Sequence, residues 1–123
     1  MADVPLGRLE KTVLDCPDPR ALAAFYGEIL GMGVNEDTDG DWVVIGREAG
    51  MRELAFQRAD PYVPPRWPDP AHPQQEHLDI RVLHPDEAER AVLALGATLL
   101  AGEKGTGFRV FADPAGHPFC LVY

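Results

Sequence analysis

The residues best suited to chemistry are a histidine and an aspartate that lie two positions apart in a short run of alternating polar and apolar residues. His77 and Asp79 belong to the run His-Leu-Asp-Ile-Arg-Val (77–82). Alternate residues of a β-strand point to opposite faces, so the two side chains should lie on one face. A neighbouring carboxylate favours the protonated imidazole, and such a pair can bind a ligand or exchange a proton. The alternative is a structural His77 that hydrogen-bonds Asp79 or the preceding segment.

This run has a counterpart earlier in the chain, which indicates an internal repeat. Lys-Thr-Val-Leu-Asp-Cys (11–16) matches it at an offset of 66 residues, and the features that follow recur at offsets of 65 to 67. Both runs lead into a helical pattern that ends at Leu-Gly, and both halves close with a turn glycine and a final strand-like run. A repeat of this length indicates a duplicated supersecondary unit.

Local signals place the elements of both units. Asp18 and Pro19 are a good N-cap and first residue for a helix, and Gly31 is a good C-terminal cap. In the first unit we expect a helix over 19–30 and strands over 11–16, from 34, 42–46 and 53–58, with a polar turn at 37–41. In the second unit we expect a helix over 85–95 and strands over 77–83, 98–100, 108–112 and 118–123.

A proline-rich segment, residues 59–76, separates the two halves. It holds six of the twelve prolines of the chain, together with Tyr62 and Trp67. This proline density excludes a regular helix or a central strand. The segment is either a stiff spacer or a flap that brings Trp67 to the mouth of a pocket or to a partner chain.

The face of the sheet that carries His77 and Asp79 is also expected to carry apolar residues. Strand alternation assigns to this face Trp42, Val44, Ala55, Gln57, Phe108, Val110, Cys120 and Val122. Apolar walls with a few convergent polar groups are typical of a small-molecule pocket. The alternative is a face that is solvated or covered in a dimer.

Length and charge limit the remaining possibilities. The chain has 123 residues and a net charge of −9, which indicates a single domain and argues against binding to nucleic acid or to an anionic membrane. No basic segment followed by an apolar run begins the chain, and no stretch is apolar enough to span a membrane. Cys16 and Cys120 should point to opposite sides of the sheet, so we expect free thiols and a cytoplasmic protein.

Three sequence motifs resemble a known family. They are Phe-Tyr-Gly-Glu-Ile-Leu-Gly-Met (25–32), Asp-Pro-Ala-Gly-His-Pro-Phe-Cys-Leu (113–121), and the proline-rich run 64–70 followed by Gln-Gln-Glu-His-Leu-Asp (74–79). Together with the repeat, they resemble the glyoxalase/bleomycin-resistance/dioxygenase group, the vicinal oxygen chelate superfamily, and within it a glyoxalase-like subgroup. The resemblance covers residues 1–123 as one domain, with unit one at about 8–58, the linker at 59–76 and unit two at 77–123.

The resemblance implies a fold and an assembly. The fold is α+β, with two tandem βαβββ units that form a curved mixed sheet around a concave pocket and helices on the outer face. The family often forms homodimers, so we expect one here.

The resemblance also implies four positions that can ligate a divalent metal, which fall on Lys11, Glu53, His77 and Cys120. Glu53 and His77 have suitable ligand atoms, whereas the Lys11 ammonium has no lone pair. Cys120 stands where the family usually has glutamate, and a thiolate suits zinc better than the hard, oxygen-rich sites for Mn, Ni or Fe. We therefore expect no catalytic metal, with a divalent metal as the alternative.

Three hypotheses for function remain. The first is a protein that binds a small organic ligand, such as an aromatic one, without a catalytic metal. The second is a metal-dependent lyase, isomerase or dioxygenase that uses His77 and Glu53, and the third is a metal-free acid/base enzyme that uses His77, Asp79 and Glu53. The expected ligand contacts are Trp42, Gln57, Trp67, Phe108, Cys120 and Lys11.

Overall fold

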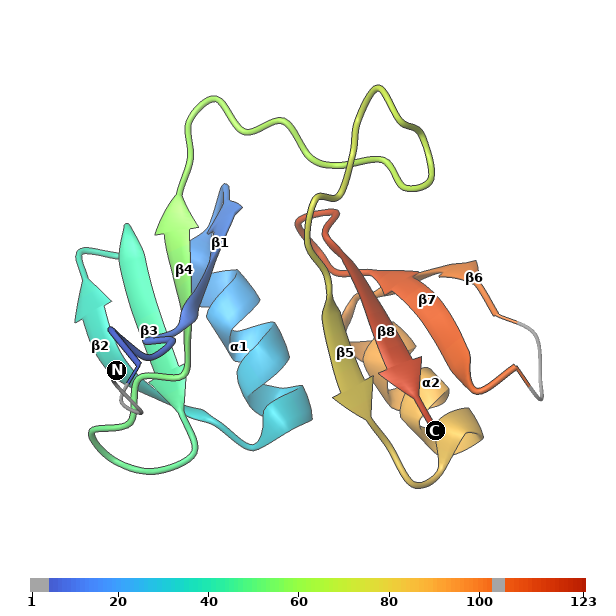
Figure 1. The fold of residues 1–123 in the computed structure, drawn as a ribbon, viewed down its shortest axis with the longest axis horizontal. Coiled ribbons are helices and arrows are strands. Elements are labelled where there is room, and N and C mark those ends of the chain that lie inside the picture. The colour runs from blue at the N-terminus through green and yellow to red at the C-terminus, as the bar shows by residue number, and fades with distance from the viewer. Residues whose placement is uncertain (1–4, 103–105) are drawn as a thin grey trace. The chain divides into compact units, whose positions relative to one another are not determined.

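A computed structural model describes residues 5–102 and 106–123, and it confirms the repeated strand-helix-strand-strand-strand order. The elements, shown in Figure 1, are β1 (Thr12–Cys16), α1 (Pro19–Leu30), β2 (Gly33–Thr38), β3 (Trp42–Gly46), β4 (Leu54–Arg58), β5 (Leu78–Arg81), α2 (Pro85–Leu95), β6 (Thr98–Ala101), β7 (Phe108–Ala112) and β8 (Pro118–Val122). Their ends lie within two residues of the predicted ones, except that β2 runs into the expected 37–41 turn. His77 lies directly before β5.

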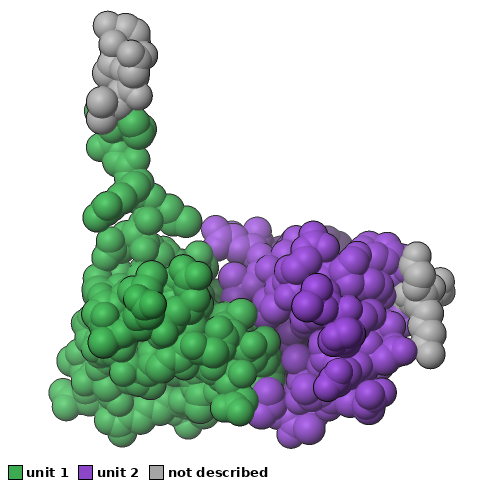
Figure 2. Space-filling model, turned by 90° about the horizontal axis from the view of Figure 1, so that it is seen from below, with its two compact units in different colours: residues 1–59 green, residues 60–123 purple. Residues whose placement is uncertain are grey.

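The strands form two four-stranded mixed sheets with the same topology. The strand orders are β1-β4-β3-β2 and β5-β8-β7-β6. In each sheet the first strand of the unit pairs in parallel with the last, and the other pairs are antiparallel. The predicted α+β fold of two βαβββ units is therefore confirmed. The chain divides into two compact units, residues 1–59 and 60–123, which are coloured separately in Figure 2.

In the first unit, helix α1 covers one face of the sheet. Its start is fixed by the Asp18 side chain, which accepts a hydrogen bond from the Ala21 N–H at 3.2 Å, and its end by Gly31, whose φ of 67° is left-handed. Glycine adopts this conformation without the steric cost that a Cβ would bring. Tyr26 is fully buried and stacks on Phe56 of β4 at 5.9 Å between ring centroids, which fixes the helix on the sheet.

In the second unit, helix α2 buries fewer apolar side chains than helix α1 does in the first unit. Of the predicted apolar face of α2, Val92 is buried, whereas Ala91 and Leu95 are exposed. A buried arginine of β7, Arg109, compensates at the first turn, where it donates a hydrogen bond to Asp86 at 2.9 Å. Charge-assisted hydrogen bonds of this kind fix the orientation of a helix as well as adding stability.

The proline-rich segment packs against the second unit. The Tyr62 hydroxyl donates a hydrogen bond to the Ala115 carbonyl at 2.9 Å and lies 3.1 Å from Nε2 of His117. Pro64 lies so close to Gly116 that a Cβ there would meet it at 2.9 Å, so the glycine permits the contact. These contacts fix the segment on the same unit that carries His77.

No helix in the described ranges, 5–102 and 106–123, is both long enough and apolar enough to cross a membrane.

Candidate functional site

A cavity of about 390 Å³ lies within the second unit, on the face of the sheet that carries His77 and Asp79. Its walls come from the proline-rich segment, from strands β5, β7 and β8, and from the residues before β7. The lining residues are Trp67, Gln74, His77, Asp79, Thr106, Gly107, Phe108, Val110, Cys120 and Val122. Four of the residues predicted for the pocket face by strand alternation, Phe108, Val110, Cys120 and Val122, lie here.

Strand register explains why these side chains meet. Asp79 of β5 lies opposite Cys120 of β8, and Cys120 lies opposite Val110 of β7. Residues that are directly opposite in neighbouring strands project from the same face. A row of one carboxylate, one thiol and one apolar side chain therefore crosses the three strands.

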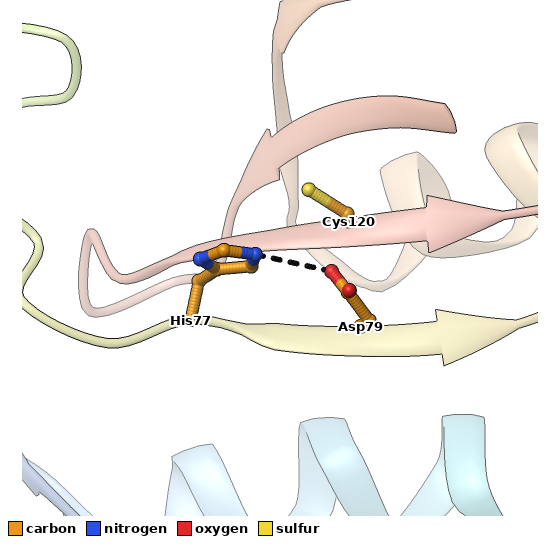
Figure 3. A group of neighbouring side chains, drawn as sticks. All are labelled: His77, Asp79 and Cys120. Carbon is orange, nitrogen blue, oxygen red and sulfur yellow. Dashed lines mark ion pairs between the residues drawn. The ribbon is translucent and has the colours of Figure 1, made fainter. Parts of the chain in front are cut away.

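His77, Asp79 and Cys120 form a compact polar cluster at the cavity, which we call the His-Asp-Cys cluster (Figure 3). The Nε2 atom of His77 lies 3.1 Å from Oδ1 of Asp79, and the potential ligand atoms of all three residues lie within 4.8 Å of one another. The His77 and Asp79 side chains are 40% and 58% exposed, whereas Cys120 is buried. Burial and the adjacent Asp79 carboxylate raise the pKa of the Cys120 thiol.

Aromatic side chains and two loop residues complete the lining. Trp67 comes from the proline-rich segment, and Phe108, which is half exposed, comes from the start of β7. Gln74 and Thr106 add polar groups that the sequence analysis did not identify. Both lie outside regular elements, where no periodicity reports the direction of a side chain.

The remaining predicted ligand contacts, Lys11, Trp42 and Gln57, lie in the first unit. The Lys11 ammonium lies 5.7 Å from the centroid of the Trp42 ring and 3.4 Å from the Glu10 carboxylate. The Trp42 indole N–H donates a hydrogen bond to Glu36 at 3.1 Å. Gln57 lies opposite Trp42 in the β3–β4 register and is exposed.

Glu53, also in the first unit, is held by Arg47. Its two carboxylate oxygens accept hydrogen bonds from the Arg47 backbone N–H at 2.8 Å and from the Arg47 Nε at 2.9 Å. This arginine holds the pKa of the Glu53 carboxyl below its usual range. The carboxylate is therefore satisfied by a protein cation, a partner that no sequence pattern predicted.

Comparison with known proteins identifies the family. Residues 11–122 match the family described as "Glyoxalase-like domain", so the chain belongs to the glyoxalase-like family of the vicinal oxygen chelate superfamily. No curated protein matches the chain.

Solved structures share the fold at low sequence identity. A possible glyoxalase from Bacillus cereus is 13% identical, with 97% of this chain and 100% of that chain covered and a TM-score of 0.70. A glyoxalase/bleomycin resistance protein/dioxygenase family enzyme from Burkholderia phytofirmans PsJN is 16% identical over 94% and 97% of the chains, with a TM-score of 0.69. A lactoylglutathione lyase from Agrobacterium tumefaciens is 20% identical over 97% and 95%, with a TM-score of 0.62. At these identities the likeness shows the fold alone.

The four positions that the family resemblance assigns to metal ligands carry side chains whose chemistry, each taken by itself, is mostly poorly matched to a hard divalent ion. Lys11 offers an ammonium beside Glu10, and Glu53 is already bound by Arg47. Cys120 offers sulfur, a soft ligand, whereas Mn²⁺ and Mg²⁺ prefer oxygen. Only His77 remains as a ligand that is both suitable and exposed.

Proposed function

We propose that the cavity of the second unit binds a small organic ligand with aromatic or other apolar character. The observation that carries this proposal is the combined lining of Trp67, Phe108 and two valines with the polar side chains of Gln74, His77 and Asp79. Small-molecule sites are typically apolar clefts of this size with a few polar groups that set the orientation. Trp67 and Phe108 offer large flat surfaces for an aromatic ring.

The charge of the cavity favours neutral or cationic ligands over anionic ones. Counting histidine as neutral, Asp79 is the one formally charged side chain among the described residues that line it. A carboxylate at a cavity wall repels an anion and attracts a cation. The Trp67 and Phe108 rings add a negative face that also favours cations.

A metal-free acid/base reaction is the second candidate, and it is supported by the 3.1 Å approach of His77 to Asp79. In this reading Asp79 orients the imidazole and His77 exchanges a proton with the bound ligand. Glu53 has a lesser claim to this role, because Arg47 occupies its carboxylate. A substrate that shows a pH-dependent rate, lost in His77→Gln, would establish this function.

The other expectations remain predictions. Ligand contact by Lys11, Trp42 and Gln57, the homodimer and the cytoplasmic location each follow from the sequence or the family. A metal-dependent lyase, isomerase or dioxygenase reaction would require a further ligand beyond His77 and Glu53, either Cys120 or a residue of a partner chain.

The test of the binding proposal is a screen of aromatic and aliphatic small molecules by thermal shift, followed by calorimetry on variants. Trp67→Leu should weaken a hit by at least tenfold. Val63→Ser changes an exposed residue of the same segment that does not line the cavity, and it should leave affinity unchanged. Hits that bind both variants equally would place the ligand outside this cavity and reject the proposal.

A further inference from the structure

We infer that a separate cavity of the second unit binds a small organic carboxylate with an apolar body. This cavity, which we call the proline cleft, has a volume of about 460 Å³ and is lined by residues 64–67, by strands β6 and β7 and by the β7–β8 turn. Of the described residues that line it, only Trp67 also lines the cavity that carries His77. The inference goes beyond the proposed function, because it assigns another site to an anion, which the His77 cavity disfavours.

Proline rings and other apolar side chains form the walls of the proline cleft. Pro64, Pro65 and Trp67 come from the proline-rich segment, Leu100 from β6 and Pro114 from the β7–β8 turn. Much of this surface is in contact with solvent, and the Leu100 side chain is 38% exposed. A ligand that covers it removes apolar surface from water, which favours a ligand with an apolar body.

Arg66 supplies the charge that selects the ligand. It is exposed, it is the one charged side chain among the described residues of the lining, and within those ranges it forms no ion pair. The Asp69 carboxylate accepts a hydrogen bond from the Ala71 N–H at 2.9 Å and lies 3.0 Å from Nδ1 of His72. These two partners lower the pKa of the Asp69 carboxyl, and the Arg66 charge has a smaller effect. The Arg66 guanidinium can therefore take a ligand carboxylate through two parallel hydrogen bonds.

Hydrogen bonds hold both walls of the proline cleft in place without a ligand. The Arg66 N–H donates to the His72 carbonyl at 2.9 Å, which fixes the proline-rich segment. On the other wall, the buried Asp113 carboxylate accepts hydrogen bonds from the Ala115 N–H at 2.9 Å and from the His117 N–H at 3.0 Å. A preformed site loses little conformational entropy when a ligand binds.

Calorimetry on the full chain with 3-phenylpropanoate and its neutral analogue 3-phenylpropanamide tests the inference. Arg66→Gln should weaken the carboxylate by about fivefold, the effect of one exposed charge at close range, and should leave the amide unchanged. Arg90→Gln is the matched control, because it removes an exposed cation of the same unit outside the lining of the cleft. It should leave both affinities unchanged.

A second pair of variants blocks the proline cleft itself. Leu100→Glu places a negative charge in its wall and should abolish binding of 3-phenylpropanoate. Leu93→Glu makes the same change outside the lining, at a residue of α2 that is 39% exposed, and should keep it. Because both side chains are exposed, neither change disrupts the core.

Asp79→Asn distinguishes the two cavities, since loss of its charge should strengthen an anion in the His77 cavity and not in the proline cleft. Tighter binding of 3-phenylpropanoate to Asp79→Asn would therefore overturn the inference without affecting the proposed function. Three other results would also overturn it: no saturable binding to the wild type, equal losses in Arg66→Gln and Arg90→Gln, or binding retained in Leu100→Glu.

Discussion

Replacing Asp79 by asparagine tests the electrostatic part of the proposed ligand site. The change removes one negative charge from the cavity wall and keeps the size of the side chain. Benzylammonium, benzyl alcohol and benzoate form a probe series of similar size with charges of +1, 0 and −1. We expect Asp79→Asn to weaken benzylammonium, to leave benzyl alcohol unchanged and to strengthen benzoate.

The magnitude follows from the exposure of the carboxylate. Two unit charges 4 Å apart interact by about 1 kcal/mol in water and by about 4 kcal/mol at the lower effective dielectric of a protein surface. The Asp79 side chain is 58% exposed, so the lower value applies. Because 1.4 kcal/mol is a tenfold change in affinity, the expected change for each charged probe is about fivefold.

Calorimetry at low and at physiological salt measures these affinities. The differences should shrink as salt rises, because mobile ions screen exposed charges. Glu87→Gln is the matched control, since it removes one exposed negative charge from the same unit outside the cavity lining. Equal changes for all three probes, or equal effects of the two variants, would show that the Asp79 charge does not act on a ligand in this cavity.

Three further predictions concern stability. Phe111→Ala removes a fully buried ring that stacks on a second phenylalanine ring with 5.5 Å between the centroids. The change should lower the free energy of unfolding by about 3–5 kcal/mol in urea titrations. A loss below about 1 kcal/mol would contradict the described core. Gly46→Ala places a Cβ against a backbone carbonyl of the following turn and should lower the free energy of unfolding by about 1–3 kcal/mol. Gly33→Ala, at the opposite register position with open space around it, should leave that free energy nearly unchanged. Equal losses in the two variants would count against this geometry. Because the pKa of Glu53 is lowered in the folded state, the Glu53–Arg47 pair stabilises the protein above the unfolded pKa of about 4.3. This stabilisation is lost as the pH falls through the pKa of folded Glu53. Arg47→Met should therefore make the loss of stability with falling pH less steep. Identical acid-unfolding curves for the Arg47 variant and the wild type would show that this pair adds nothing.

Local sequence signals were sufficient for the fold because the elements are fixed by nearby residues. Asp18 and Gly31 bound the first helix as predicted, since capping depends on the few residues at each end. Strand alternation placed Asp79, Cys120 and Val110 on one face, and the structure brings them into one row. The repeat then supplied the order of helix and strands in both units, and the mixed sheet followed from the family resemblance.

Contacts made by long side chains and loops were not predictable in the same way. Arg47 reaches Glu53 across a turn, and nothing in the spacing of the two residues separates this pair from solvated charges. Gln74 and Thr106 line the cavity from segments without regular backbone, where no periodicity applies. The apolar pattern of α2 overstated its burial, because Arg109 holds the first turn through charge rather than apolar contact.

The most direct test of the central claim is a map of amide chemical shifts in the full chain during titration with benzylammonium. We expect the largest shifts at residues lining the cavity of the second unit, around 74–79, 106–110 and 120–122. Trp67→Leu should reduce the shifts of all these residues. Shifts confined to the first unit, or no saturable shifts with benzylammonium or benzyl alcohol, would contradict the claim that this cavity is the ligand site.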